Sequence, residues 1–293
     1  MEEARYYTAG SEPGSVRCEL CPRGCVIPPG GRGFCLVRKA GEAGKLYTVN
    51  YGKVPALSFD PIEKKPFARF YPGTRILSAG TAGCNLDCMF CQNHTLSRSD
   101  KGVSVEYLGP DELCGIIAGD SENLGIAFTY NEPSVWYEYV YDTAALLKKR
   151  SPEKKAVLVS NGYISAEPLE MLLPFVDAVN FDLKGPEKFY RTLCGASPGA
   201  FEAVTRSISM AVTAGRHVEI SFLAIDGKNT DDESVSAVID FIASLSPEIP
   251  FHISRCFPNY RMRDIAPTRM ETLRYIRDRA LEKLEFVYLG NVG

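Results

Sequence analysis

Residues 83–91 read GCNLDCMFC and carry three cysteines, Cys84, Cys88 and Cys91, within one short stretch. Three thiolates at this spacing can hold a cubane iron–sulfur cluster by three of its four irons. The fourth iron is then open to a further ligand, and an open position on a protein-bound metal is where chemistry usually takes place. A closed site of four cysteines would instead indicate structure or electron transfer. The spacing therefore predicts a reactive metal centre.

An apolar run at 75–80 leads into this loop, and beyond it predicted strands alternate with predicted helices. The further strands are expected at 124–130, 156–160, 178–183, 217–224, 251–256 and 285–289. Amphipathic segments near 109–119, 133–149, 165–174, 187–213, 231–245 and 267–283 predict the helices. Nearly continuous apolar strands between helices are typical of a parallel sheet covered on both faces. No GxGxxG follows the first strand, so an incomplete α/β barrel fits better than a dinucleotide-binding fold.

Polar, charged or glycine residues follow the end of every predicted strand. After the cysteine loop they occupy 129–133, 160–163, 182–185, 226–229, 254–255 and 290–291. In barrels of this class, ligands bind at the rim formed by the carboxyl ends of the strands. The repeated pattern therefore predicts a ligand site at that rim.

A second group of cysteines lies in the Gly- and Pro-rich segment 1–35, which has few signs of regular structure. In a reducing compartment, clustered cysteines indicate a metal rather than disulfides. Four thiolates are typical of a closed structural zinc site, and an auxiliary iron–sulfur cluster fits the same ligands. The spacing is not that of a standard zinc ribbon, so both remain open. The four ligands are expected to be Cys18, Cys21, Cys25 and Cys35.

Three further cysteines are isolated in the sequence: Cys114, Cys194 and Cys256. We expect each to be a small buried apolar residue.

Composition limits the classes of partner. The 293 residues carry a net charge of −3 with the two signs well mixed, which does not favour nucleic-acid binding. No apolar run reaches the length of a membrane helix, and the amino terminus lacks the apolar region of a signal peptide. We therefore expect a cytoplasmic protein without a membrane partner.

The cysteine spacing after the first strand, with Phe90 just before the last cysteine, resembles the signature of the radical S-adenosylmethionine (SAM) superfamily. Within it the chain looks most like enzymes similar to pyruvate formate-lyase activating enzyme, and more narrowly like the radical enzyme of the AmmeMemoRadiSam group. The similar segments cover nearly the whole chain and are 18–35, 60–66, 91–93, 130–133, 181–184, 252–255 and 288–292.

This resemblance implies an incomplete (β/α)6-type TIM barrel at 73–293, preceded by a small Cys-rich extension at 1–72. It implies that Cys84, Cys88 and Cys91 bind a [4Fe-4S] cluster whose open iron binds SAM. One electron from a donor such as flavodoxin or ferredoxin would then release a 5′-deoxyadenosyl radical that abstracts hydrogen from a substrate. In such enzymes the cofactor carries the chemistry and the protein orients it.

The resemblance also assigns roles beside the second and third strands. Many relatives have Gly-Gly-Glu after the second strand, whereas this chain has Tyr130-Asn131-Glu132. Glu132 is the expected partner of the SAM amino group, although a carboxylate before a proline also suits a helix start. Ser160 and Asn161 match the position that reaches the ribose, or they form a capping turn.

Charged residues at later strand ends are further candidates. Asp182 and Lys184 alternate and so share a face, where they form a structural ion pair or contact the nucleoside or substrate. Arg255 is expected to hold the methionyl carboxylate or an acidic substrate. His252 and His94 are expected to be structural.

The substrate is not named by the sequence. The resemblance favours a protein target, as in glycyl-radical activases, with radical methylation and small-molecule modification as enzymatic alternatives. An iron–sulfur electron carrier is the non-enzymatic alternative. A zinc-stabilised RNA-binding module is a further one that the acidic balance disfavours.

Overall fold

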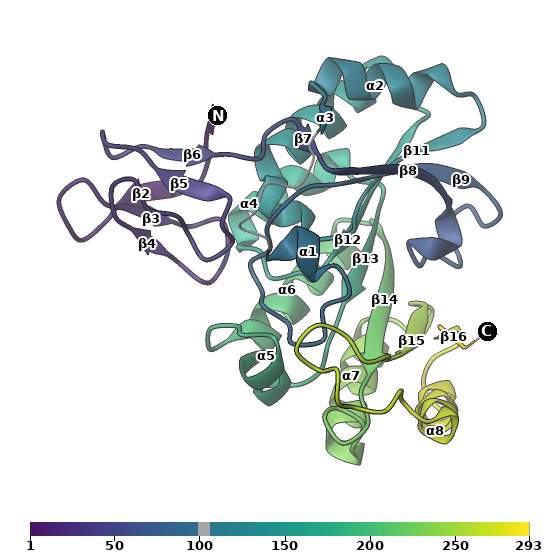
Figure 1. Cartoon of the computed structure of the whole chain (residues 1–293). Helices are drawn as coiled ribbons and strands as arrows, with labels where there is room; N and C mark the ends of the chain where they lie inside the picture. Colours follow the sequence, from purple (N-terminus) through teal and green to yellow (C-terminus); the bar gives the residue numbers. More distant parts are fainter. Residues whose placement is uncertain (99–105, 293) are drawn as a thin grey trace.

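The computed structural model describes residues 1–98 and 106–292, and an eight-stranded sheet forms its centre (Figure 1). Strand β8 is antiparallel to β9, and the other six pairings are parallel. In spatial order the strands are β16 (Val287–Gly290), β15 (Phe251–Arg255), β14 (His217–Ala224), β13 (Ala178–Asp182), β12 (Lys155–Ser160), β11 (Asn123–Phe128), β9 (Arg75–Gly80) and β8 (Ala56–Pro61).

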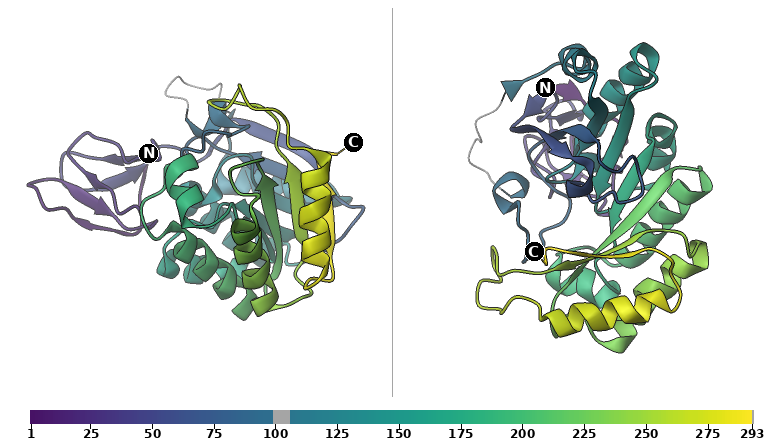
Figure 2. Two further views of the ribbon diagram at one scale, coloured as in Figure 1. Left: turned by 90° about the horizontal axis from the view of Figure 1, so that it is seen from below. Right: turned by 90° about the vertical axis from the view of Figure 1, so that its right-hand side faces the viewer.

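Helices connect the seven parallel strands and cover the outer face of the sheet (Figure 2). Helix α6 illustrates why these helices pack on the sheet. Its buried positions recur at the three- and four-residue spacing of one helix face, and they include Val204, Ile208 and Ala211. The connecting helices are α2 (Pro110–Gly119), α3 (Tyr137–Arg150), α4 (Ala166–Leu172), α5 (Glu187–Leu193), α6 (Ala200–Thr213), α7 (Asp232–Leu245) and α8 (Met270–Leu281).

The predicted α/β architecture with a parallel sheet is confirmed. Six helical connections join the seven parallel strands, and β8 and β16 do not pair within the described ranges, so the sheet is open. The helix expected at 187–213 is corrected to two helices, α5 and α6. Gly195 and Gly199, with φ of +60° and +83°, lie between them and turn the chain.

The amino-terminal segment forms two small antiparallel sheets beside the large one (Figure 1). The strands before residue 35 are only two or three residues long, as the Gly- and Pro-rich composition predicts. One sheet contains β1 (Glu2–Glu3), β6 (Leu46–Thr48) and β5 (Arg38–Ala40), and the other contains β2 (Tyr7–Ala9), β3 (Val16–Cys18) and β4 (Val26–Ile27). The division at residues 72 and 73 stays a prediction, and β8, which precedes it, is the edge strand of the large sheet.

A short ladder of β7 (Lys53–Val54) and β10 (Glu106–Tyr107) and the small helix α1 (His94–Ser97) complete the elements that bear on the site.

Buried polar contacts attach the small sheets to the large one. The guanidinium of Arg38 donates two hydrogen bonds to the carboxylate of Glu138 on α3, at 2.9 and 2.8 Å. The same carboxylate accepts the backbone N–H of Arg5 at 2.8 Å. Both side chains of the ion pair are almost fully buried, so each charge depends on the other for stabilisation.

The connection between β8 and β9 closes the amino-terminal end of the sheet interior. Asn180 on β13 donates to the carbonyl of Pro66 at 2.7 Å. The buried carboxylate of Glu219 on β14 accepts the backbone N–H groups of Ala68 and Arg69 at 2.9 and 2.8 Å. These bonds hold residues 66–69 as a floor beneath the strand ends where the site lies.

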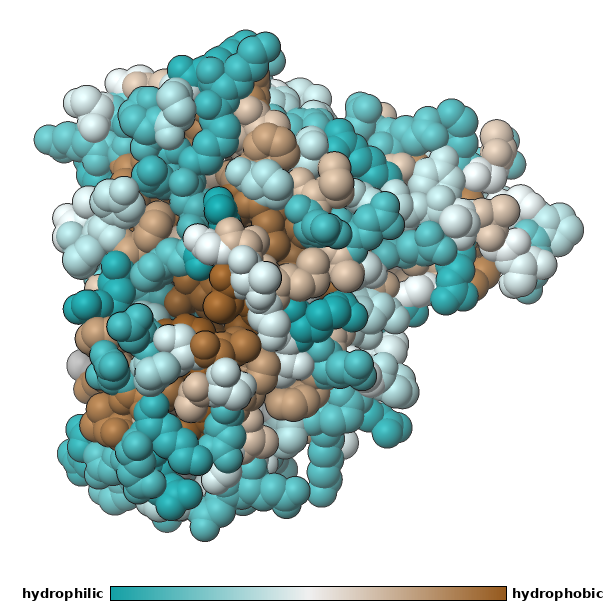
Figure 3. All heavy atoms as spheres, turned by 180° about the vertical axis from the view of Figure 1, so that it is seen from behind, coloured by the Kyte–Doolittle hydropathy of each residue, from teal (hydrophilic) through white to brown (hydrophobic). Residues whose placement is uncertain are grey.

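The rear face of the molecule is mostly hydrophilic, with apolar residues gathered toward its middle (Figure 3). Among the described residues, none of the helices combines the length and the hydropathy that a membrane-spanning segment needs.

Candidate functional site

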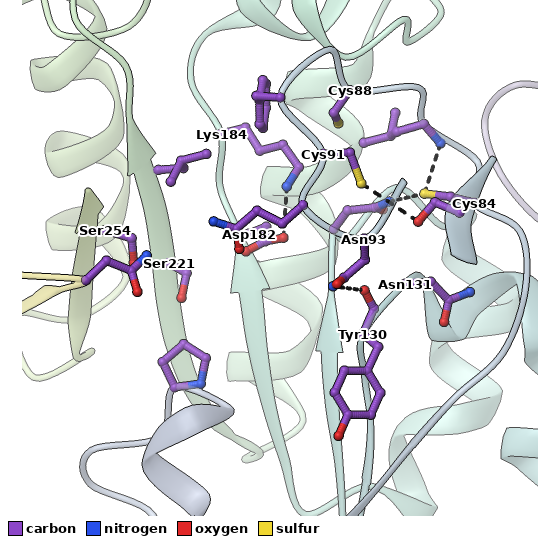
Figure 4. A pocket seen from close by; sticks show the side chains of 18 residues that line it. Cys84, Cys88, Cys91, Asn93, Tyr130, Asn131, Asp182, Lys184, Ser221 and Ser254 are labelled. Atoms are coloured by element: carbon purple, nitrogen blue, oxygen red, sulfur yellow. Dashed lines mark hydrogen bonds and ion pairs between the residues drawn. The ribbon is translucent and has the colours of Figure 1, made fainter. Parts of the chain in front are cut away.

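A cavity of about 250 Å³ lies at the carboxyl ends of the parallel strands (Figure 4). It combines the cysteine loop with polar side chains from several strand ends, as the rim pattern predicts. The lining residues are Pro66, Cys84, Leu86, Cys88, Phe90, Cys91, Gln92, Asn93, Ser97, Tyr130, Asn131, Asn161, Asp182, Lys184, Ser221, Leu223, Ser254 and Asn291.

Backbone contacts fix the cysteine loop against the end of helix α5. The N–H groups of Asp87 and Met89 donate to the carbonyls of Cys194 and Leu193 at the end of α5, at 2.9 and 2.8 Å. The ring of Phe90 packs on that of Phe189, with their centroids 5.6 Å apart. The loop conformation is therefore held by the rest of the fold.

The three thiols of this loop line the same cavity. Burial raises the pKa of Cys84 and Cys91, and a hydrogen bond with Cys194 together with burial raises that of Cys88. Thiols in this state need a cation to become thiolates, and a bound metal supplies that charge.

The donor set fits an iron–sulfur cluster, because cysteine thiolates are its standard ligands. In the described ranges no three His, Cys, Asp or Glu side chains already converge at ligating separations. Binding therefore requires the thiols of Cys84, Cys88 and Cys91 to turn toward a common centre.

Two asparagines connect the loop to neighbouring strand ends. The amide of Asn131, after β11, donates to the carbonyl of Gly83 at 2.7 Å. The amide of Asn161, after β12, donates to the side-chain oxygen of Asn85 at 2.9 Å and lies 3.7 Å from the sulfur of Cys84. Both side chains thus place amide groups beside the expected cluster.

Tyr130 precedes Asn131 and adopts the left-handed conformation, with φ of +70°. Its carbonyl accepts from the Asn93 amide, and its hydroxyl donates to Asp60 at 2.9 Å. Although burial alone would raise it, hydrogen bonds from Lys65 and Tyr130 lower the pKa of Asp60 to about 2. This charged group holds Tyr130 in a conformation that is unfavourable for a residue with a side chain.

Glu132 is fully buried and is not among the lining residues. Its carboxylate accepts from the backbone N–H of Ser134 at 2.9 Å, from the Ser160 hydroxyl at 2.8 Å and from the backbone N–H of Asn161 at 2.8 Å. Burial raises its pKa, and these three donors oppose that rise. The structure thus joins Glu132, Ser160 and Asn161, but only Asn161 lines the cavity.

Asp182 and Lys184 face each other beside the cysteine loop, with 2.8 Å between carboxylate and ammonium (Figure 4). Both line the cavity. Although burial alone would lower it, Asp182 and the nearby Cys88 keep the pKa of Lys184 well above its usual value. The ammonium is therefore charged and within reach of a bound anion.

Arg255 does not line the cavity, and its Nε donates to the carbonyl of Thr268 at 2.7 Å. Adjacent strand residues point to opposite faces, and here Ser254 is the one directed to the cavity. His252 donates from Nε2 to the Glu219 carboxylate at 2.6 Å, and His94 stacks on Tyr260. Both histidines have the structural contacts expected of them.

The isolated cysteines Cys114, Cys194 and Cys256 are buried, as expected.

Sequence reasoning did not select several lining residues as site residues. Asn93, Asn131 and Asn291 lie within segments already singled out from the sequence, but they were not selected as site residues; their positions after strand ends or cysteines were the available signal. Ser221 is a polar residue within the apolar strand β14, which was also a signal.

The four amino-terminal cysteines surround a separate, much smaller cavity of about 20 Å³. Its lining also includes Arg38 and Asn85. Because Asn85 belongs to the cysteine loop of residues 83–91, the small cavity lies directly behind that loop.

Comparison with known proteins agrees with this geometry. The family model of the radical SAM superfamily matches residues 79–242, which include the cysteine loop and strands β11 to β14. The chain is 39% identical to the uncharacterized protein MJ0808 of Methanocaldococcus jannaschii over 295 aligned residues, covering 100% of this chain and 86% of that protein.

A probable GTP 3′,8-cyclase of Methanosarcina acetivorans is 30% identical over 66% of this chain and 58% of its own length. Among solved structures, a radical SAM methyltransferase from Sphaerobacter thermophilus is similar in fold, with a TM-score of 0.55 at 16% identity, covering 75% of this chain and 67% of that chain. The family match and the cysteine-lined cavity together place this chain in the radical SAM superfamily, whose members use SAM and a [4Fe-4S] cluster.

Proposed function

We propose that this radical SAM enzyme binds SAM between the cysteine loop and the ends of β11 to β13, and acts on a protein segment held over β14 to β16. One observation carries the proposal. A single cavity joins three cysteines of one loop to Asn131, Asn161 and Lys184, and continues to Ser221 and Ser254.

The cysteine thiolates would hold the [4Fe-4S] cluster. When bound and reduced, the cluster together with SAM would supply the radical chemistry that removes a hydrogen atom from the substrate. Lys184 provides an ammonium for the SAM carboxylate, because a charged donor binds a carboxylate strongly. Asn161 offers its side chain to the ribose, and Glu132 positions Asn161 through its backbone N–H. Leu86, Phe90 and Leu223 form apolar parts of the wall and help to exclude water.

A protein target is supported by the open sheet and by the resemblance to glycyl-radical activases. Because β8 and β16 do not pair in the described part of the chain, the half-barrel has a side through which a chain segment can enter. Serine and asparagine side chains along β14 to β16 supply hydrogen-bonding groups suited to a peptide backbone.

A nucleoside triphosphate substrate, which similarity to the probable cyclase brings into consideration, has less support. A triphosphate carries several negative charges and is usually bound by several cations or oriented backbone N–H groups. Among the lining residues that the structure describes, Lys184 is the cation, and it is already paired with Asp182.

The first test measures SAM cleavage. Anaerobically reconstituted protein, reduced with dithionite or flavodoxin, should convert SAM to 5′-deoxyadenosine and methionine. Absence of cleavage by protein with a verified cluster would contradict the enzymatic proposal and favour an electron carrier.

The second test identifies the substrate class. Lysate from cells grown on deuterated medium is separated into macromolecules and small molecules, and each fraction is added to the reduced enzyme with unlabelled SAM. We expect deuterium in 5′-deoxyadenosine only with the macromolecular fraction, and its loss after protease treatment. Deuterium from the small-molecule fraction would instead favour a small substrate.

A further inference from the structure

The four amino-terminal cysteines line one small cavity. Cys18 ends β3, Cys21 and Cys25 lie in the turn before β4, and Cys35 follows it. The turn is closed by hydrogen bonds from the N–H of Cys18 to the carbonyl of Cys25 at 2.9 Å and from the N–H of Gly24 to that of Cys21 at 3.1 Å. Four thiols from separate parts of a short segment thus line one small cavity, and metal binding requires them to turn toward a common centre, because no three of them in the described ranges already lie at ligating separations.

The size of this cavity indicates what it can hold. Its volume of about 20 Å³ is close to the space that one water molecule occupies in a cavity of this kind. One metal ion fits such a space, whereas a cubane of four irons and four sulfides does not. The cavity at the other cysteine loop, at about 250 Å³, is more than ten times larger. Among single ions, zinc is the usual occupant of a closed tetrahedral site of four thiolates.

Arg38 supplies an independent observation at the same place. Its side chain is 1% exposed and lines the small cavity, and both terminal nitrogens bind Glu138. Its remaining donor, the Nε–H, is buried and has no hydrogen-bond partner among the described residues. A buried donor without a partner is costly, and a metal-bound thiolate would satisfy it.

The small cavity is joined to the reactive cysteine loop by direct contacts. Gly83, just before Cys84, has φ of +91°, and a Cβ there would lie 2.5 Å from the carbonyl oxygen of Cys35. Arg23, between Cys21 and Cys25, donates to the carbonyl of Asn85 at 3.1 and 3.2 Å.

Arg98 joins the two loops a second time. It donates to the carbonyl of Phe34 at 3.0 Å and to that of Cys84 at 3.3 Å. Whatever orders residues 18–35 therefore also orders the backbone around Cys84.

We propose that Cys18, Cys21, Cys25 and Cys35 bind one zinc ion in a closed tetrahedral site, that Arg38 donates its Nε–H to a zinc-bound thiolate, and that this zinc anchors the loop that carries Cys84. The ion takes no part in the radical reaction. It gives the Gly- and Pro-rich segment the order that its short strands do not supply.

The test uses the triple variant Cys84→Ala, Cys88→Ala, Cys91→Ala, so that its outcome is independent of the proposed radical activity. Purified anaerobically, it should contain one zinc per chain and no stoichiometric iron, and X-ray absorption should show four sulfur neighbours at about 2.3 Å. Four irons per chain in this variant, or a folded chain without metal, would overturn the proposal.

The role of Arg38 is tested by zinc release to a chelator. Arg38→Lys keeps the charge but removes the Nε–H, so zinc release should be about tenfold faster. The matched control is Arg5→Lys, whose side chain pairs with Asp142 on the same helix at the surface. Equal release rates for wild type and Arg38→Lys would remove Arg38 from the proposal.

Anchoring has its own measurement. After zinc removal by the chelator, hydrogen exchange at residues 83–91 should accelerate by at least about tenfold, while exchange in the middle of α6 should stay unchanged. Unchanged exchange at 83–91 would show that the zinc does not anchor this loop.

Discussion

The two cysteine sites of this protein lie back to back and differ in the space they enclose. Behind Asn85, four cysteines surround a cavity of about 20 Å³. In front of it, three cysteines open into a cavity of about 250 Å³ with polar side chains from several strands. The site with fewer cysteines has the larger cavity. A thiolate that is absent leaves a coordination position on the metal for a ligand, and that ligand needs space.

The two sites also differ in how deeply their charged side chains are buried. Arg38 is fixed by Glu138 in a pair that is almost fully buried, so it can serve a permanent partner. Lys184 pairs with Asp182, whose side chain is 40% exposed, so the ammonium can exchange partners when a ligand arrives. A closed site therefore suits an ion that stays, and an open site suits a molecule that is consumed.

The largest expected effect separates the two sites. Cys88→Ala should abolish iron binding at the open site and reduce SAM cleavage to the background rate, because two thiolates hold a cubane cluster poorly. Zinc at the amino-terminal site should remain. Elemental analysis and 5′-deoxyadenosine formation measure both, and Cys114→Ala, a buried cysteine outside both cavities, is the control. Full iron content in Cys88→Ala would show that the cluster ligands are elsewhere.

Local sequence predicted the parts of this comparison that depend on spacing. The cysteine intervals singled out two groups of cysteines, and the structure shows that each group lines one cavity. Apolar runs located the seven parallel strands, because a strand buried on two faces is apolar at nearly every position. The contacts of Glu132 could not be predicted in this way. Its partners Ser160 and Asn161 are brought to it by the pairing of β11 with β12, which no local pattern encodes.

The face of the sheet to which each residue of β15 points could not be predicted from the local sequence either. Ser254 and Arg255 are adjacent, and the register of β15 against β14 decides which one faces the cavity. Arginine was the more prominent residue in the sequence, but the lining residue is serine.

The second prediction joins the two sites. Gly83→Ala should destabilise the fold by about 3 kcal/mol, because the new Cβ would meet the Cys35 carbonyl in a backbone conformation that alanine disfavours. Both metals should also be released faster. Gly73→Ala is the matched control: its φ is +81°, but nothing lies within 4 Å, so only the conformational cost of about 1 kcal/mol applies. Equal losses in urea unfolding would mean that the contact at Gly83 relaxes freely.

The third prediction concerns residues 66–69, the floor of the larger cavity. Pro66 lines that cavity, and none of these four residues lines the smaller one. Although burial alone would raise it, hydrogen bonds from His217, His252 and two backbone N–H groups lower the pKa of Glu219 to about 2. A carboxylate with a lower pKa in the folded state stabilises the fold above its unfolded pKa of 4.5, and this stability disappears as the pH falls toward 2.

Glu219→Gln should therefore cost roughly 3 kcal/mol at pH 7, and the gap to wild type should close between pH 5 and pH 2. Urea unfolding across this range measures the effect. Glu285→Gln, at an exposed position, should change stability by less than about 0.5 kcal/mol. A gap that is independent of pH would show that the side-chain shape, not the carboxylate charge, holds the floor.

The smallest expected effect tests the exchangeable charge of the open site. Lys184→Gln should raise the KM for SAM about tenfold and leave kcat nearly unchanged, because it removes a charged donor to the carboxylate without moving the reacting groups. Lys188→Gln, the same change at an exposed position on α5, should leave both constants unaltered. The initial rate of 5′-deoxyadenosine formation against SAM concentration separates the two constants. A lower kcat at unchanged KM would mean that Lys184 acts on the substrate. The ammonium of Lys184 would then interact with the substrate and not with SAM.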